Sequence, residues 1–233
     1  GGQQRSAPGA GYVRHMNPIV HAELSWLMAQ GLRERRDRVL VTVAGIAPDL
    51  DGLSLLAGED FYGRYHHVLT HGYVAALGVM AVCALLARQR LAVALLSLAA
   101  FHLHLGCDLL GSGPGWPLYY FWPTSLHEWF WSGQWDLASW QNSLIGMAAT
   151  LACLACALRW RRTALEVVSP RWDAEVTRAL RLRFADDAPV PPGSVQFWTA
   201  VAGIEPGATW IVAALIMLVL ASLLYGRGIL ALY

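Results

Sequence analysis

The chain has 233 residues, of which 56% are hydrophobic and only 14% are charged. Soluble domains carry about 25% charged residues, so this composition and a mean hydropathy of +0.40 indicate a membrane protein. The formal net charge of +1 excludes the strongly basic surface that is typical of nucleic-acid-binding proteins. All four cysteines lie inside apolar runs, which argues against a disulfide framework and against a zinc-thiolate site.

The N-terminal part of the chain predicts a tail followed by two short helices. Residues 1–15 are rich in Gly, Gln, Ser and Pro and lack the apolar core of a signal peptide, so we expect a disordered tail. Asn17 and Pro18 are a favourable cap and first residue for a helix that continues to about residue 30. A second apolar segment, 39–46, stops at Pro48. Both are shorter than the roughly 20 residues that span a bilayer, so we expect a short helical hairpin.

Four longer apolar runs follow, each close to the roughly 20 residues that a membrane-spanning helix needs. They cover residues 68–87, 91–110, 140–158 and 208–225. The sequence therefore predicts an all-α, polytopic membrane protein with about four transmembrane helices plus the short N-terminal helical hairpin.

We expect one membrane-embedded domain over residues 16–233, divided by composition into four parts. Residues 16–123 are a core that carries the candidate site, and residues 124–141 are an outer aromatic loop. Residues 159–206 are a cytoplasmic loop that contains an amphipathic helix at 172–184, and residues 207–225 are an anchor helix. Arginines concentrate in the turns at 33–38, 88–90 and 159–162, and the positive-inside rule predicts that these turns lie in the cytoplasm.

Histidines and aspartates gather at the opposite ends of the expected helices. The densest group is His66, His67 and His71, which stand within six residues just before a long apolar run. His104 and Asp108 are four residues apart and share a helix face. His102 is about 200° around the helix from His104, so we interpret it as a hydrogen-bonded interior histidine. The topology brings all the candidate ligands to the non-cytoplasmic face, where ionisable groups in a membrane are functional candidates.

Imidazole and carboxylate ligands without thiolate suit zinc, with manganese or iron as alternatives. The candidate set exceeds what one tetrahedral zinc requires, so we expect one or two ions. Asp49 and Asp51 are also the candidate catalytic residues, with one of them acting as a general base. Other polar residues are expected behind the ligands or facing substrate, namely His67, Ser25, Thr70 and His127. The candidate metal ligands are His21, Asp49, Asp51, His66, His71, His104 and Asp108.

Five motifs in order resemble a family of bacterial inner-membrane proteins described as membrane-bound metal-dependent hydrolases, of which some members are associated with the SOS response and LexA. The resemblance covers residues 16–123 and implies a metal-dependent hydrolase, distantly similar to zinc-dependent phospholipase C. The matching segments are HAELS at 21–25, PDLD at 48–51, HHVLTH at 66–71, HLGCD at 104–108 and the Gly/Pro segment from Gly113 to Pro123.

Two positions depart from the family pattern. His67 stands where the family has Arg, and Gly72 stands where it has Ser. The family motif favours His66 and His71 as ligands, whereas helical spacing favours His67, four residues before His71. We expect the helix to begin near His67, with His66 and His71 binding the metal and His67 lying behind them or facing substrate.

The leading hypothesis is a hydrolase of a lipid or lipid-linked phosphoester, which uses metal-activated water at the non-cytoplasmic face of the bacterial inner membrane. An intramembrane metalloprotease lacks support because the sequence contains no HExxH motif. The other alternative is a non-catalytic subunit of a larger membrane assembly. The expected partners are membrane lipid, a lipid-type substrate, and other membrane proteins or further copies of the chain, but not nucleic acid. The six tryptophans at 116–140 predict an interfacial belt or a lid over the site.

Overall fold

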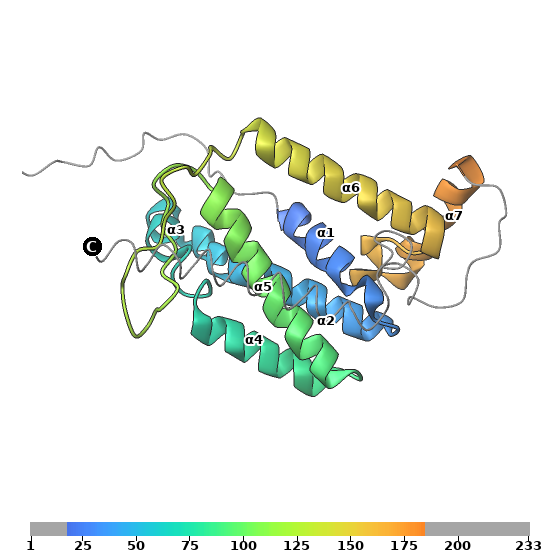
Figure 1. Ribbon diagram of the computed structural model, residues 1–233, viewed down its shortest axis with the longest axis horizontal. Helices are drawn as coiled ribbons and strands as arrows, with labels where there is room; N and C mark the ends of the chain where they lie inside the picture. Colours follow the sequence, from blue (N-terminus) through green and yellow to red (C-terminus); the bar gives the residue numbers. More distant parts are fainter. Residues whose placement is uncertain (1–17, 185–233) are drawn as a thin grey trace, which may run out of the picture.

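The structure, a computed structural model, describes residues 18–184 (Figure 1). The expected tail at 1–15, the end of the loop at 185–206 and the anchor helix at 207–225 lie outside the described residues. Within 18–184 the fold is all-α, as predicted, with no β-strand beyond an isolated bridge between Leu118 and Trp129.

The described chain consists of α-helices joined by short 3₁₀ segments, which are labelled η. The elements are α1 (Pro18–Met28), η1 (Ala29–Gly31), α2 (Arg35–Ile46), η2 (Ala47–Ala57), α3 (Glu59–Tyr65), α4 (Tyr73–Leu86), α5 (Arg90–Gly111), α6 (Trp140–Trp160), η3 (Ala164–Val167) and α7 (Pro170–Phe184).

Three described helical segments are long and apolar enough to cross a membrane: Arg35–Ala57, Arg90–Gly111 and Trp140–Trp160. α2 ends at Ile46, where the apolar segment was expected to end, but the expectation that this segment is too short to cross a membrane was wrong, because the helical chain continues as η2. Pro48 stands at the start of that 3₁₀ helix, where the missing N–H of proline costs no hydrogen bond.

The start of the next helix also differs from the prediction. α4 begins at Tyr73, whereas the apolar run suggested residue 68, and α4 is a shorter apolar helix of 14 residues. Residues 66–72 form turns instead, because their polar groups bond to other segments of the chain rather than along a helix. Thr70 donates its backbone N–H to Asp51, and the carbonyl of His67 accepts from Tyr119.

α5 lies among the other helices and packs against α2 and α4, while α1 packs against α2 and α6 (Figure 1). Small side chains take part in these contacts, including the fully buried Ala44 of α2 and Ala100 of α5. Small residues let helix backbones approach closely, which is typical of helix packing in membranes. This packing brings the ends of α1, α2, α4 and α5 together.

The arginine-rich turns meet at one end of the molecule, as the topology prediction requires. Asp37 at the start of α2 accepts the backbone N–H groups of Arg88 and Gln89 at 2.9 Å each. Arg38 pairs with the buried Glu166 of η3 at 2.6 Å. This end, with α7, lies opposite the end that carries α3 (Figure 1). The side of the membrane that it faces stays a prediction.

α7 confirms the expected helix near 172–184, and its polar side faces the rest of the protein. Thr177 is buried, and Asp173 accepts a hydrogen bond from the hydroxyl of Thr163 at 2.8 Å. Trp172 and Val176 are exposed on the other side. An exposed apolar face next to a polar, packed face is compatible with a helix on a membrane surface.

Candidate metal centre

Asp108, near the end of α5, is the centre of a buried cluster of histidines. Its Oδ2 atom lies 3.0 Å from Nε2 of His104 and 3.5 Å from Nε2 of His71. Its Oδ1 atom lies 3.6 Å from Nε2 of His21 on α1. All four side chains are buried. Three separate parts of the chain therefore meet at one carboxylate.

His104 has its two ring nitrogens in different environments. Nδ1 lies 2.8 Å from the backbone carbonyl of Gly45. Since a carbonyl can only accept, Nδ1 must carry the proton, and the other nitrogen, Nε2, faces Asp108. The ring of His21 stacks on His104 with centroids 3.8 Å apart. Such orientation of one nitrogen by a backbone carbonyl is characteristic of metal-ligating histidines.

Asp51 uses both carboxylate oxygens to hold two histidines. Oδ1 lies 2.8 Å from Nδ1 of His66, and Oδ2 lies 3.0 Å from Nδ1 of His71. Thr70 reinforces this arrangement, because its hydroxyl accepts from the backbone N–H of Asp51 at 3.0 Å and donates to the carbonyl of Pro48. The structure thus places Asp51 behind the rings of His66 and His71, with its oxygens already engaged.

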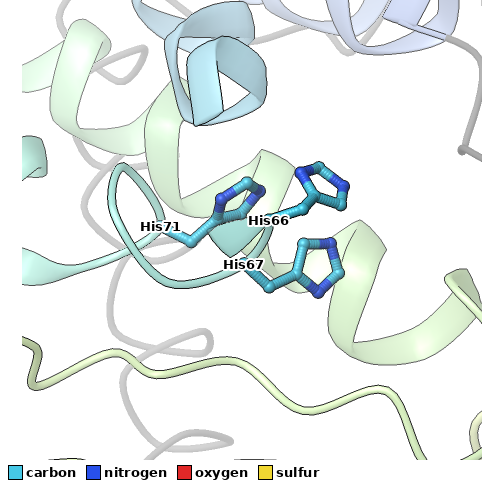
Figure 2. Close-up of side chains that lie close together, drawn as sticks. All are labelled: His66, His67 and His71. Carbon is cyan, nitrogen blue, oxygen red and sulfur yellow. The ribbon is translucent and has the colours of Figure 1, made fainter. Parts of the chain in front are cut away.

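The loop at 66–72 brings three histidine rings into the cluster. His66, His67 and His71 are all buried and extend from this one loop (Figure 2). His67 has a φ of 68°, which is uncommon for a residue other than glycine. The expectation that the helix begins near His67 was wrong, because α4 begins only at Tyr73. The backbone turn at His67 brings its Nε2 atom to 3.8 Å from Oδ2 of Asp108.

Asp49 is the most open member of the cluster. Its side chain is 28% exposed, and its Oδ1 atom lies 3.5 Å from Nε2 of His104. Asp49 and Asp51 project from different sides of η2, because residues in a 3₁₀ helix are separated by about 120°. The carboxylate of Asp51 therefore supports the histidine loop, while the carboxylate of Asp49 lies beside His104.

Many polar atoms of the cluster have no hydrogen-bond partner among the described residues. An unsatisfied buried donor or acceptor costs about 1–3 kcal/mol, so a native structure rarely leaves several together. Imidazole and carboxylate are the donors that zinc, manganese and iron accept, so the residues present fit a divalent metal. The unpaired atoms are Nδ1 and Nε2 of His21, Nδ1 of His67, Nε2 of His71, Nε2 of His104, Oδ2 of Asp49 and Oδ2 of Asp108.

Burial and neighbouring charges act differently on the histidines of the loop. Burial, followed by the charge of His71, holds the pKa of His67 well below its ordinary value, so this ring is neutral at neutral pH. Burial also opposes protonation of His71, but the nearby carboxylates of Asp108, 3.5 Å away, and Asp51, 3.0 Å away, outweigh it and raise the pKa of His71. A metal ion between His71 and Asp108 would replace that proton, because ligands bind metal in their deprotonated form.

Three further residues, two of which are candidates, have clear positions. Ser25 is buried on α1 against Gly45 of α2. His127 is exposed in the aromatic loop, with its ring 5.3 Å from Trp129, and the structure does not bring it into the cluster. The interpretation of His102 is confirmed, because its two nitrogens bond to the carbonyl of Leu98 and to the hydroxyl of Tyr120.

Two residues near the cluster, Tyr62 and Gln134, were not singled out in the sequence. Tyr62 stacks on His66 with centroids 4.5 Å apart, and its position four residues before His66 is a spacing that could have indicated this contact. Gln134 is buried and donates to the backbone carbonyl of Asp108 at 3.1 Å. No spacing connects Gln134 to the histidines, because it comes from a separate segment of the chain. Trp116 lies 5.7 Å from the ring of His67 and belongs to the tryptophan-rich segment for which a belt or a lid is predicted.

The aromatic loop also explains why position 72 is a glycine here. The backbone N–H of Tyr73 donates to the carbonyl of Tyr120 at 2.9 Å, which holds the loop against the start of α4. A Cβ atom at Gly72 would lie 3.0 Å from the carbonyl oxygen of Tyr120 and 3.1 Å from that of Trp122. A serine at this position would therefore require the aromatic loop to move outward by a few tenths of an ångström.

The fold and the site define an all-α membrane protein with a buried histidine and aspartate cluster at one end of its helices. Residues 16–171 match the family of the YdjM inner membrane protein, and the chain belongs to this family. The expectation of a bacterial inner-membrane protein is thereby confirmed. No match to the chain is found among curated proteins or among solved structures.

Proposed function

We propose that this protein is a membrane-embedded, metal-dependent hydrolase that acts on a phosphoester of a lipid or lipid-linked substrate. The observation that carries the proposal is the set of unpaired, buried histidine nitrogens and aspartate oxygens around Asp108. A structural zinc site is closed by four ligands and is often rich in cysteine. This cluster offers more donors than that, contains no thiolate, and includes the partly exposed Asp49.

Three buried residues would hold the first ion: His21, His104 and Asp108. A bound zinc or manganese ion would polarise a phosphoryl oxygen and lower the pKa of water, which makes hydrolysis possible at neutral pH. The histidines of the cluster are already held in position, since Gly45 holds His104 and Asp51 holds His71. Such supporting contacts typically change metal affinity or activity by about 10–100-fold.

The two candidate catalytic aspartates have different roles in this proposal. Asp51 is a positioning residue, because both of its oxygens are bound to histidine nitrogens. Asp49 is the candidate general base, since its Oδ2 has no hydrogen-bond partner among the described residues and its side chain is partly exposed. A carboxylate that accepts a proton from water must have a free oxygen next to the substrate.

The surface of η2 supports a lipid as the substrate. Leu50, Leu53 and Leu56 are 56%, 61% and 88% exposed. In a 3₁₀ helix, with about 3 residues per turn, these three side chains form one row along the helix. The row begins directly after Asp49, so an acyl chain that packs along it would bring its ester group to the open side of the cluster.

The experiment is metal analysis of the purified full-length protein, followed by assays with a short-chain phospholipid and with a generic phosphodiester in mixed micelles. We expect bound zinc, hydrolysis that a chelator abolishes, and recovery after zinc is returned. Asp49→Asn should keep the metal and reduce kcat by about 10²–10⁴-fold, which is the range for loss of a general base. His102→Ala is the matched control and should retain both metal and activity.

The outcomes separate this proposal from the alternative. Bound zinc without turnover of any ester would favour a non-catalytic subunit of a membrane assembly that retains the metal site. Absence of tightly bound metal in the purified wild-type protein, together with no uptake of added zinc, would overturn the metal-dependent function itself.

A further inference from the structure

A second group of ring nitrogens lies beside the ligands of the first ion. His66, His67 and His71 each offer one nitrogen, and these atoms all lie within 4.8 Å of one another. One ligand atom from each of His21, His104 and Asp108 likewise lies within 4.8 Å of the other two. The first group comes from the loop before α4 and the second from α1 and α5. The cluster is therefore two adjoining sets of donors rather than one.

Asp108 lies between the two sets. Its Oδ1 atom faces His21, and its Oδ2 atom lies 3.0 Å from Nε2 of His104 in the same set. The same Oδ2 atom also lies 3.5 Å from Nε2 of His71 and 3.8 Å from Nε2 of His67, so the carboxylate contacts both sets. A carboxylate within reach of both sets of ligands occupies the position of a bridging ligand in two-metal hydrolytic sites, where the ions are about 3.5–4 Å apart.

His67 has the features of a metal ligand. The residue is only 2% exposed, and its Nδ1 atom has no hydrogen-bond partner among the described residues. Its φ of 68° turns the ring into the cluster, and a hydrogen bond from the N–H of Tyr119 to its carbonyl, at 3.1 Å, supports this turn. An imidazole that only packed against its neighbours would not require an unusual backbone conformation and an unpaired nitrogen together.

We propose that the cluster binds two divalent ions, the second held by His66, His67 and His71, with Asp108 bridging the pair. The inference rests on the proposed function for the first ion and adds the number of ions and a ligand role for His67. Three imidazole nitrogens favour zinc at the second position.

The test measures the number of zinc ions per chain in the purified full-length protein by mass spectrometry after dialysis against zinc. We expect two in the wild-type protein and one in His67→Gly. Glycine is the chosen replacement because it adopts a positive φ without strain, so the variant loses the imidazole but not the backbone turn. His102→Ala is the control and should retain two.

X-ray absorption of the wild-type protein supplies a second readout that needs no variant. A zinc–zinc distance of about 3.5–4 Å supports the inference. One ion per wild-type chain, or two ions in both the wild type and His67→Gly, would overturn the inference while leaving the first site intact. No zinc in the wild type would instead overturn the proposed function.

Discussion

His104 donates its Nδ1 proton to the backbone carbonyl of Gly45 over 2.8 Å, which fixes the ring so that Nε2 faces Asp108. Gly45 can lie there only because it has no side chain. A Cβ atom at this position would come within 1.8 Å of the hydroxyl oxygen of Ser25 on α1. The close contact between α1 and α2 thus sets the orientation of a histidine on a third helix, α5.

The first prediction concerns this contact. Gly45→Ala should lower the free energy of unfolding by about 1–3 kcal/mol, because overpacking forces neighbouring side chains and backbone to shift. It should also weaken metal binding, since α2 carries the acceptor of His104. Thermal unfolding in detergent and zinc content measure the two effects. Gly78→Ala is the control, because a Cβ atom there meets nothing within 4 Å. Equal unfolding temperatures for the two variants would contradict the proposed role of Gly45.

The second prediction concerns the ligands of α5. His104→Ala and Asp108→Ala should each sharply reduce the zinc content of the purified protein, because each removes a donor at the centre of the cluster. His102→Ala should leave the zinc content near the wild-type value, since both of its ring nitrogens bond elsewhere. Similar losses in all three variants would show that α5 faces the metal differently.

The third prediction tests the positioning role of Asp51. Asp51→Asn should lower zinc affinity by about 10–100-fold, because an amide can accept a hydrogen bond from only one of the two histidines through its single oxygen. Competition with a fluorescent chelator measures the affinity. Asp60→Asn, which changes an exposed carboxylate on α3, is the control. Complete loss of zinc in Asp51→Asn would instead indicate that Asp51 binds the metal directly.

The fourth prediction compares two ion pairs at the arginine-rich end. Glu166→Gln should destabilise the protein by about 3–5 kcal/mol, because it leaves the buried guanidinium of Arg38 without its counter-charge. Glu34→Gln should cost about 0–1 kcal/mol, since the pair of Glu34 with Arg88 is exposed to solvent. Chemical denaturation in detergent compares the two variants, and a similar loss in both would contradict the difference in burial.

The fifth prediction concerns topology. In a variant whose native cysteines are replaced by alanine, Arg88→Cys should react with a membrane-impermeant thiol reagent only from the cytoplasm. Ser132→Cys should react only from outside, because the positive-inside rule orients the arginine-rich turns inward. Intact cells and inverted membrane vesicles distinguish the two sides. The reverse labelling pattern would move the cluster to the cytoplasmic face and exclude lipids of the outer leaflet as substrates.

The all-α membrane class was predictable because it depends on composition and on the lengths of apolar runs, which are properties of the sequence alone. The positions of α5 and α6 followed the apolar pattern within about two residues. His104 and Asp108 could be assigned to one face because four residues make about one turn of a helix. His102 could be assigned to another face for the same reason.

The arrangement of the histidine loop was decided by tertiary contacts. Helical spacing suggested that His67 and His71 share a face, but a hydrogen bond from Thr70 to Asp51 and one from Tyr119 to His67 hold residues 66–72 in turns until Tyr73. The different positions of Asp49 and Asp51 likewise depend on the 3₁₀ geometry of η2, which the sequence did not indicate. The periodicity of a sequence indicates only which side chains share a face of one helix. The orientation of these side chains depends on hydrogen bonds between segments far apart in the chain, and those bonds exist only once the helices have packed.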